Sequence, residues 1–271
     1  MQSTGAKLYS FLAIISFFAA VGMRLSMLLL DLSAAFGIAY YVLIATGLVL
    51  IAVDSFKQKK YAAAFEFENN FHLNAFSYLA SLGFFVDFVH SCVRIFFSAQ
   101  DGSYRILVSF IPLCLICLFA LLSCFYFYTV GLSYGDKNYD FRELKVLHLA
   151  PLLWSVSQAL SIMHQAISFS RDVENVIKYT VMIFGVCFFF CFASEIESDG
   201  GAKPSTLFLA RAYSYISVIF FIDRLMLLLN GNAKISDDDG VFSLSVLLIS
   251  AFVFFFEKNI IYHKSISAKE D

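Results

Sequence analysis

The feature that most constrains this sequence is a series of long apolar runs, each separated from the next by a short polar break. Residues 207–262 show the plan, with an apolar run, a polar break at 230–240 and a second apolar run. A helix that crosses a membrane needs about 20 mainly apolar residues. Two such runs joined by a short turn therefore predict a helical hairpin that spans the membrane twice, and the same plan occurs three more times upstream.

The composition supports this interpretation. Hydrophobic residues make up 60% of the 271 residues and charged residues 15%, whereas a soluble domain is usually about half apolar and about a quarter charged. Little sequence remains outside the apolar runs, so we expect residues 1–271 to form a single integral membrane domain. The net charge of −2 offers no basic surface for nucleic acid.

The apolar runs pair into four hairpins and predict an all-α polytopic bundle of eight transmembrane helices. The first run continues past Arg24 to Leu30, which is long for a signal peptide and favours a span. Phe84–Asp87 matches Phe220–Asp223, which suggests tandem parallel repeats about an axis along the membrane normal. The expected spans are 8–30, 34–53, 73–97, 106–130, 146–169, 179–194, 206–229 and 241–261, so the hairpins cover about 8–53, 73–130, 146–194 and 206–261.

The distribution of lysine and arginine predicts the orientation. The two termini and the breaks after the second, fourth and sixth spans carry eleven of these residues, and the opposite loops carry four. Positive residues are enriched in cytoplasmic loops. We therefore expect a multi-pass protein of the cell membrane with both termini in the cytoplasm (N-in/C-in).

Strongly polar side chains concentrate in the odd-numbered spans. Burying such groups in hydrocarbon costs several kcal/mol each unless they are paired or hydrated, so we expect the odd helices to line the centre and the even helices to shield them from lipid. Several of these groups lie about five residues outward of their span's midpoint, roughly 8 Å, which predicts one layer in the outer half. The candidate ligand-binding residues are Arg24, Asp87, His90, Gln158, Ser161, His164, Gln165, Asp223 and Arg224.

This layer has two interpretations. With Arg94 of the third span counted and the histidines neutral, the layer carries a charge of about +1, which favours a transporter-type carrier or a receptor for a small anionic or amphipathic ligand. Alternatively the groups only pair with one another and fix the helix register. The protein would then be a non-catalytic scaffold or subunit that meets a membrane or cytoplasmic partner through its cytoplasmic segments.

No catalytic motif accompanies the layer. The sequence has no Walker-type phosphate loop and no HExxH zinc helix, so we expect no enzyme, no metal and no cofactor. All six cysteines fall inside apolar runs, where cysteine usually acts as a small packing residue. The CxxC spacing of Cys114 and Cys117 is therefore interpreted as packing.

One hairpin resembles known sequences. Pro151-Leu-Leu-Trp154 is followed by a polar stripe, then by Asp172-Val-Glu-Asn175 and an aromatic run. This pattern resembles hairpins in uncharacterised bacterial polytopic membrane proteins. The resemblance implies a bacterial inner-membrane location and implies no chemistry.

Overall fold

The computed structural model describes residues 4–30, 34–57, 70–100, 106–135, 144–168, 173–197, 203–231 and 238–270. In these ranges the chain is helical and has no strand, and eight of its helices are long and apolar enough to cross a membrane. The helices are α1 (Thr4–Leu30), α2 (Ala34–Lys57), α3 (Phe71–Gln100), α4 (Ile106–Gly135), α5 (Ala150–Ser168), α6 (Val173–Glu197), α7 (Pro204–Leu229) and α8 (Asp238–Glu270), with a short 3-10 helix, η2 (Lys145–Leu149), before α5.

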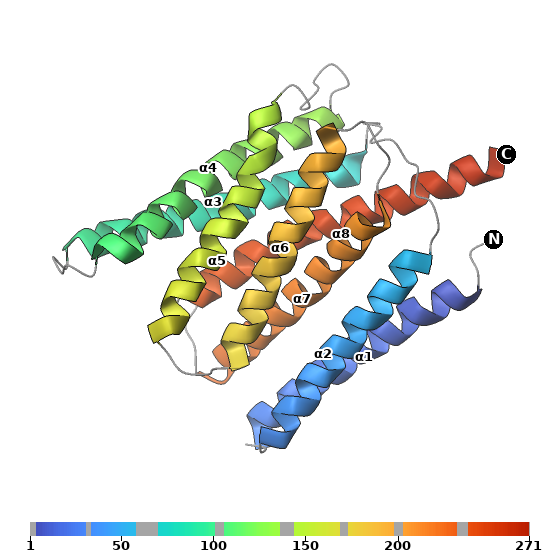
Figure 1. Cartoon of the computed structure of the whole chain (residues 1–271), viewed down its shortest axis with the longest axis horizontal. Coiled ribbons are helices and arrows are strands. Elements are labelled where there is room, and N and C mark those ends of the chain that lie inside the picture. Colours follow the sequence, from blue (N-terminus) through green and yellow to red (C-terminus); the bar gives the residue numbers. More distant parts are fainter. Residues whose placement is uncertain are drawn as a thin grey trace.

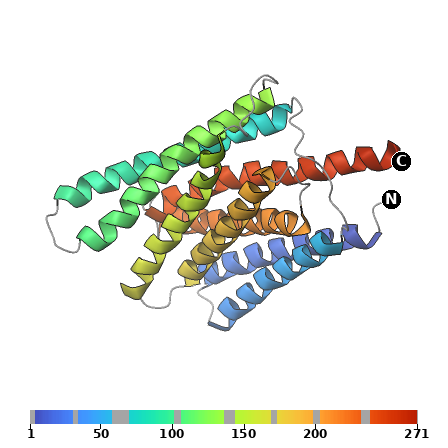
Figure 2. The ribbon, with the colours of Figure 1, turned by 45° about the horizontal axis from the view of Figure 1, so that its top comes forward.

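The eight helices run side by side, and consecutive helices run in opposite directions (Figure 1). Both termini lie at the same end of the bundle (Figures 1 and 2). This end also holds the C-terminal ends of α2, α4 and α6. The arrangement agrees with four consecutive hairpins, whereas the predicted repeat symmetry and the N-in/C-in orientation remain predictions.

Six of the helices form a closed ring. Each helix from α3 to α7 packs against the next one in the sequence, and α8 closes the ring by packing against α3 as well as α7. The α1–α2 hairpin stands outside this ring and packs on α7 (Figure 2). Only 22% of the residues in the most hydrophobic stretch of α1 are accordingly buried, compared with 50% in that of α7.

Aromatic side chains fill the centre of the ring. Phe84 on α3 packs on Phe127 of α4 at 5.3 Å and on Trp154 of α5 at 4.9 Å, measured between ring centroids. Phe127 in turn contacts Phe252 of α8 at 4.9 Å, and all four residues are fully buried. Such rings prefer offset or edge-to-face contacts at these separations, so this cluster holds odd and even helices together.

The expectation that the odd helices line the centre of the bundle and the even helices shield them from lipid is therefore wrong. The most hydrophobic parts of α6 and α8 are each 50% buried, whereas the corresponding parts of α1 and α3 are 22% and 28% buried. The physical reason is that Phe and Trp at the ring centre bury large apolar areas from both odd and even helices, namely α3, α4, α5 and α8. Polar side chains are instead accommodated by pairing between neighbouring helices.

Most predicted spans lie within one observed helix. The observed helix extends beyond the predicted span where polar residues at its end are also helical. The sixth span was predicted to begin at Tyr179, whereas α6 begins at Val173 and includes the buried Lys178. Lys178 forms an ion pair with Asp239 of α8. Because this partner offsets the cost of burying the ammonium group, the helix continues through a residue that hydropathy assigns to a turn.

Candidate functional site

A chain of ion pairs runs across the bundle at the end opposite the termini. Arg24 of α1 pairs with Asp223 of α7. The next residue of α7, Arg224, pairs with Asp239 of α8 at 2.8 Å, and Asp239 also accepts a hydrogen bond from Lys178 of α6. Four helices are thereby joined by charged contacts within the membrane-spanning part, as buried charges require.

A second polar group surrounds Asp87 of α3, which is buried. Trp154 Nε1 and Gln158 Nε2, both on α5, donate hydrogen bonds to Asp87 Oδ2 at 2.7 and 2.9 Å. Asp87 faces a small cavity of about 20 Å³, which is about the space of one water molecule. The cavity is lined by Asp87, His90, Ser91, Arg94, Ile116, Gln158, Ser161, Ile162, Lys178 and Phe242.

The described members of the predicted site fall into two groups, which Lys178 connects because it lines the small cavity and pairs with Asp239. Four of them, Asp87, His90, Gln158 and Ser161, line the small cavity. The other described members are in helix contacts: Arg24 and Asp223 join α1 to α7, and Arg224 joins α7 to α8. The side chains of His164 and Gln165 lie outside the described residues. Ligand binding by these nine residues remains a prediction.

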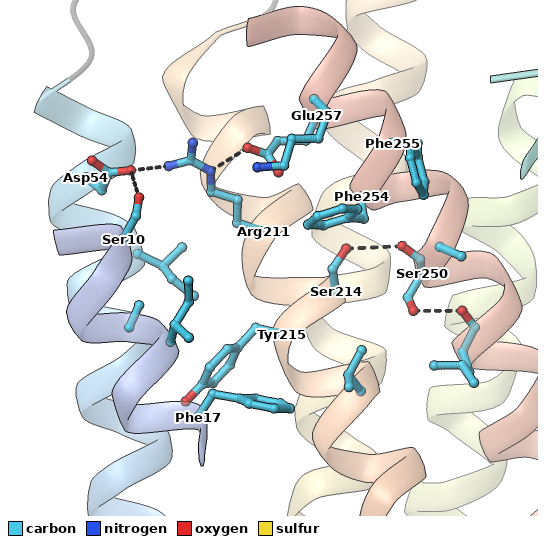
Figure 3. Close-up of a pocket in the computed structure, with 17 residues that line it drawn as sticks. Ser10, Phe17, Asp54, Arg211, Ser214, Tyr215, Ser250, Phe254, Phe255 and Glu257 are labelled. Carbon is cyan, nitrogen blue, oxygen red and sulfur yellow. Dashed lines mark hydrogen bonds and ion pairs between the residues drawn. The ribbon is translucent and has the colours of Figure 1, made fainter. Parts of the chain in front are cut away.

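A much larger cavity lies elsewhere, between the α1–α2 hairpin and the α7–α8 hairpin (Figure 3). Its volume is about 510 Å³, within the usual range of ligand pockets, roughly 300–1,000 Å³. It lies toward the end of the bundle that carries the termini, because Ser10 is near the start of α1 and Asp54 near the end of α2. It is lined by Ser10, Ala13, Ile14, Phe17, Ile51, Asp54, Arg211, Ser214, Tyr215, Val218, Leu247, Ser250, Ala251, Phe254, Phe255, Glu257 and Lys258.

One end of this cavity is charged. Arg211 of α7 reaches between two carboxylates, donating from Nε to Glu257 Oε1 at 2.8 Å and from Nη1 to Asp54 Oδ2 at 2.6 Å (Figure 3). Ser10 Oγ donates to the same Asp54 oxygen at 3.0 Å. With Lys258, which also lines the cavity, the ionised side chains at this end carry two positive and two negative charges. The charged end is therefore electrically balanced.

The rest of the cavity is apolar and reaches the outer face of the bundle. Phe17 and Tyr215 pack edge to face at 5.8 Å on the side of α1 and α7, and Phe254 and Phe255 come from α8 (Figure 3). Ile14 is 54% exposed and Phe254 is 44% exposed. Because the exposed side chains of a membrane-spanning helix face lipid, the apolar part of the cavity is bordered by side chains that contact the bilayer.

None of Asp54, Arg211 and Glu257, which form the charged end of this cavity, is among the residues predicted from the sequence to bind a ligand. Asp54 lies just beyond the expected end of the second span at residue 53, whereas α2 continues to Lys57 and includes it. Arg211 lies near the inner end of its span, where an arginine side chain could extend to the interface, but it is turned inward between two carboxylates. The sequence feature that could have indicated this cavity is that Asp54, Arg211 and Glu257 all lie near the ends of predicted spans on the side of the two termini. An arginine buried at that level requires carboxylate partners.

Comparison of the chain with protein-family models, with curated proteins and with solved structures finds no match. The eight apolar helices identify a multi-pass membrane protein.

Proposed function

We propose that this membrane protein binds a membrane lipid in the cavity between α1, α2, α7 and α8, as a carrier or a receptor. The observation that carries the proposal is the form of the cavity, which combines an apolar body of about 510 Å³ with one charged, hydrogen-bonding end. Ligand pockets are typically mostly apolar with a few polar groups that fix the orientation of the ligand. An amphipathic molecule matches this division.

The charged end favours a headgroup without net charge. Arg211 is already held by Asp54 and Glu257, and Lys258 balances the second carboxylate. A net charge on the headgroup would be left without a counter-ion in a region of low dielectric constant, which costs free energy. A zwitterionic headgroup such as phosphoethanolamine can place its phosphate near Lys258 and its ammonium near Glu257.

The apolar part suits an acyl chain that enters from the bilayer. Ile14 of α1 and Phe254 of α8 border the cavity and are also exposed on the outer face of the bundle. A lipid could therefore keep its headgroup at the charged end while its chain lies along these side chains. If the termini are cytoplasmic, as the lysine and arginine distribution predicts, this lipid belongs to the inner leaflet.

A photoreactive phosphatidylethanolamine tests the proposal. The probe carries a diazirine in its acyl chain, and the protein is irradiated in vesicles that contain the probe and then digested. We expect the cross-links to concentrate on peptides of α1 and α8 that contain Ile14 and Phe254, and to fall when unlabelled phosphatidylethanolamine is added in excess.

The alternative, a scaffold or partner subunit, predicts another pattern. Cross-links would then be spread over all lipid-facing helices in proportion to their exposure, and excess unlabelled lipid would dilute them uniformly. That result would contradict a lipid site in this cavity.

A further inference from the structure

Two cysteines from neighbouring helices are in contact. The Sγ atoms of Cys92 on α3 and Cys117 on α4 lie 3.4 Å apart, and both residues are half-buried with free thiols. We propose that Cys92 and Cys117 form an oxidisable dithiol that a lipid-soluble quinone converts into a disulfide joining α3 to α4. The proposal is independent of the lipid site, because neither residue lines that cavity.

The geometry supports bond formation between these two sulfurs. A disulfide has an S–S length of about 2.04 Å, so the two sulfurs must approach by only about 1.4 Å, which side-chain rotation can supply. The helices that carry them, α3 and α4, form an extensively packed antiparallel hairpin. The two positions therefore stay opposite each other in the folded protein.

A neighbouring contact on the same interface serves as a comparison. Cys124 of α4 lies 3.3 Å from the hydroxyl oxygen of Ser81 on α3, and its thiol therefore faces a hydroxyl group. Of the two α3–α4 contacts, only the one between Cys92 and Cys117 pairs two sulfurs. Both contacts therefore show a closely packed cysteine on the α3–α4 interface, but only the Cys92–Cys117 contact can form a disulfide.

The location selects the class of oxidant. Both cysteines lie inside membrane spans, Cys92 within Phe71–Phe97 and Cys117 within Phe110–Gly135. Charged, water-soluble oxidants such as glutathione disulfide enter hydrocarbon poorly because of their desolvation cost. Since both side chains are half-buried rather than enclosed, an apolar oxidant dissolved in the bilayer can reach them.

A quinone balances the reaction. The two S–H bonds of Cys92 and Cys117 break and one S–S bond forms. The two protons and two electrons pass to one quinone, which becomes the quinol. One disulfide is therefore formed for each quinone reduced.

The test uses the purified full-length protein in vesicles, reduced first and then exposed to decylubiquinone. Free thiols are subsequently alkylated and counted by mass spectrometry of the intact chain and of its peptides. We expect the number of free thiols to fall from six to four, one equivalent of quinol to form, and a Cys92–Cys117 cross-linked peptide to appear. Thermal unfolding of the oxidised protein should shift upward by a few degrees, because the cross-link restricts the unfolded chain.

Variants identify the pair. Cys92→Ser and Cys117→Ser should each keep five free thiols and form no quinol, whereas Cys114→Ser and Cys187→Ser should each lose two thiols as the wild type does. Retention of all six thiols by the wild-type protein would overturn the proposal without reliance on any variant. Oxidation of Cys92→Ser or Cys117→Ser to the same extent as the wild type would also overturn it, since another pair would then be responsible.

Discussion

Arg24 on α1 donates a hydrogen bond from Nε to the carboxylate oxygen Oδ1 of Asp223 on α7, and the two side chains are only 10% and 2% exposed. This ion pair connects the outer α1–α2 hairpin to the six-helix ring. Hydrophobic packing distinguishes poorly between a helix–helix contact and a helix–lipid contact in a membrane, because lipid chains are equally apolar. We infer that the Arg24–Asp223 pair, together with the Arg211–Asp54 pair toward the other end of the bundle, fixes where the hairpin attaches.

Replacing one partner of this pair should destabilise the protein. Asp223→Asn removes the carboxylate that balances Arg24, and breaking a buried ion pair on one side typically costs about 3–5 kcal/mol. We expect a clear decrease in the melting temperature measured by fluorescence-detected size-exclusion chromatography. The double variant Arg24→Met/Asp223→Leu should recover much of the loss, because an apolar pair leaves no buried charge. A double variant as unstable as Asp223→Asn would contradict this role.

Much of the fold could be predicted from the sequence, because the free energy of burying a polar backbone in lipid limits each apolar run to one helix. The eight spans follow from that rule alone. The arrangement of the helices does not, since apolar surfaces of similar composition do not specify which neighbour each helix meets. The ring of α3–α8 depends on aromatic packing around Phe84, Phe127 and Trp154, which is decided by shape.

The candidate site was harder to predict than the fold. Polar residues such as Asp87 and Asp223 were identified as buried, and both are, but their partners were not. Asp87 is bonded to α5, and Asp223 to α1, whereas Lys178, which lines the cavity at Asp87 and pairs with Asp239, was not among the predicted site residues. The large cavity depends on how the α1–α2 hairpin sits against α7 and α8, which is a tertiary property that no local pattern encodes.

The single tryptophan reports on the environment of Asp87. Trp154 Nε1 donates to Asp87 Oδ2 at 2.7 Å, and excitation moves electron density of indole away from its five-membered ring, which a carboxylate at Nε1 favours. Asp87→Asn removes the negative charge and keeps an oxygen acceptor, so we expect the emission maximum to shift to shorter wavelength. Glu257→Gln, at the opposite end of the bundle, is the matched control and should leave the spectrum unchanged. An unchanged spectrum for Asp87→Asn would argue against a negative charge on Asp87 beside the indole.

Gly47 on α2 allows the close approach of Tyr215 on α7. A Cβ atom at position 47 would lie 2.6 Å from Tyr215 Cζ, which is inside van der Waals contact. Gly47→Ala should therefore push α2 away from α7 and lower the melting temperature. Gly22→Ala on α1 is the control, because nothing lies within 4 Å of its added Cβ and alanine is favoured over glycine in a helix by about 0.5–1 kcal/mol. Equal effects of the two substitutions would be inconsistent with the contact.

The fork of Arg211 should not be replaceable by a lysine. Arg211 uses two different nitrogens, Nε for Glu257 and Nη1 for Asp54, whereas lysine presents a single ammonium group on a flexible, unforked chain. Losing one charged hydrogen bond costs about 1.5–3 kcal/mol, so Arg211→Lys should unfold at a lower temperature. Lys57→Arg, at an exposed position of α2, provides the comparison and should be neutral. A fully stable Arg211→Lys variant would show that one of the two bonds contributes little.

The most direct test of the lipid site is native mass spectrometry. Phosphatidylethanolamine is titrated into the detergent-solubilised protein, and the detergent is removed in the spectrometer so that bound lipid can be counted. Ala251 lines the cavity on α8, and Ala251→Phe should fill it, whereas Ala45→Phe places the same ring on an exposed position of α2 that does not line the cavity. We predict that the wild type and Ala45→Phe each retain one tightly bound lipid that Ala251→Phe lacks, with all three proteins equally folded by circular dichroism. Equal lipid retention by Ala251→Phe and the wild type, or no retained lipid in the wild type, would contradict a lipid site between α1, α2, α7 and α8.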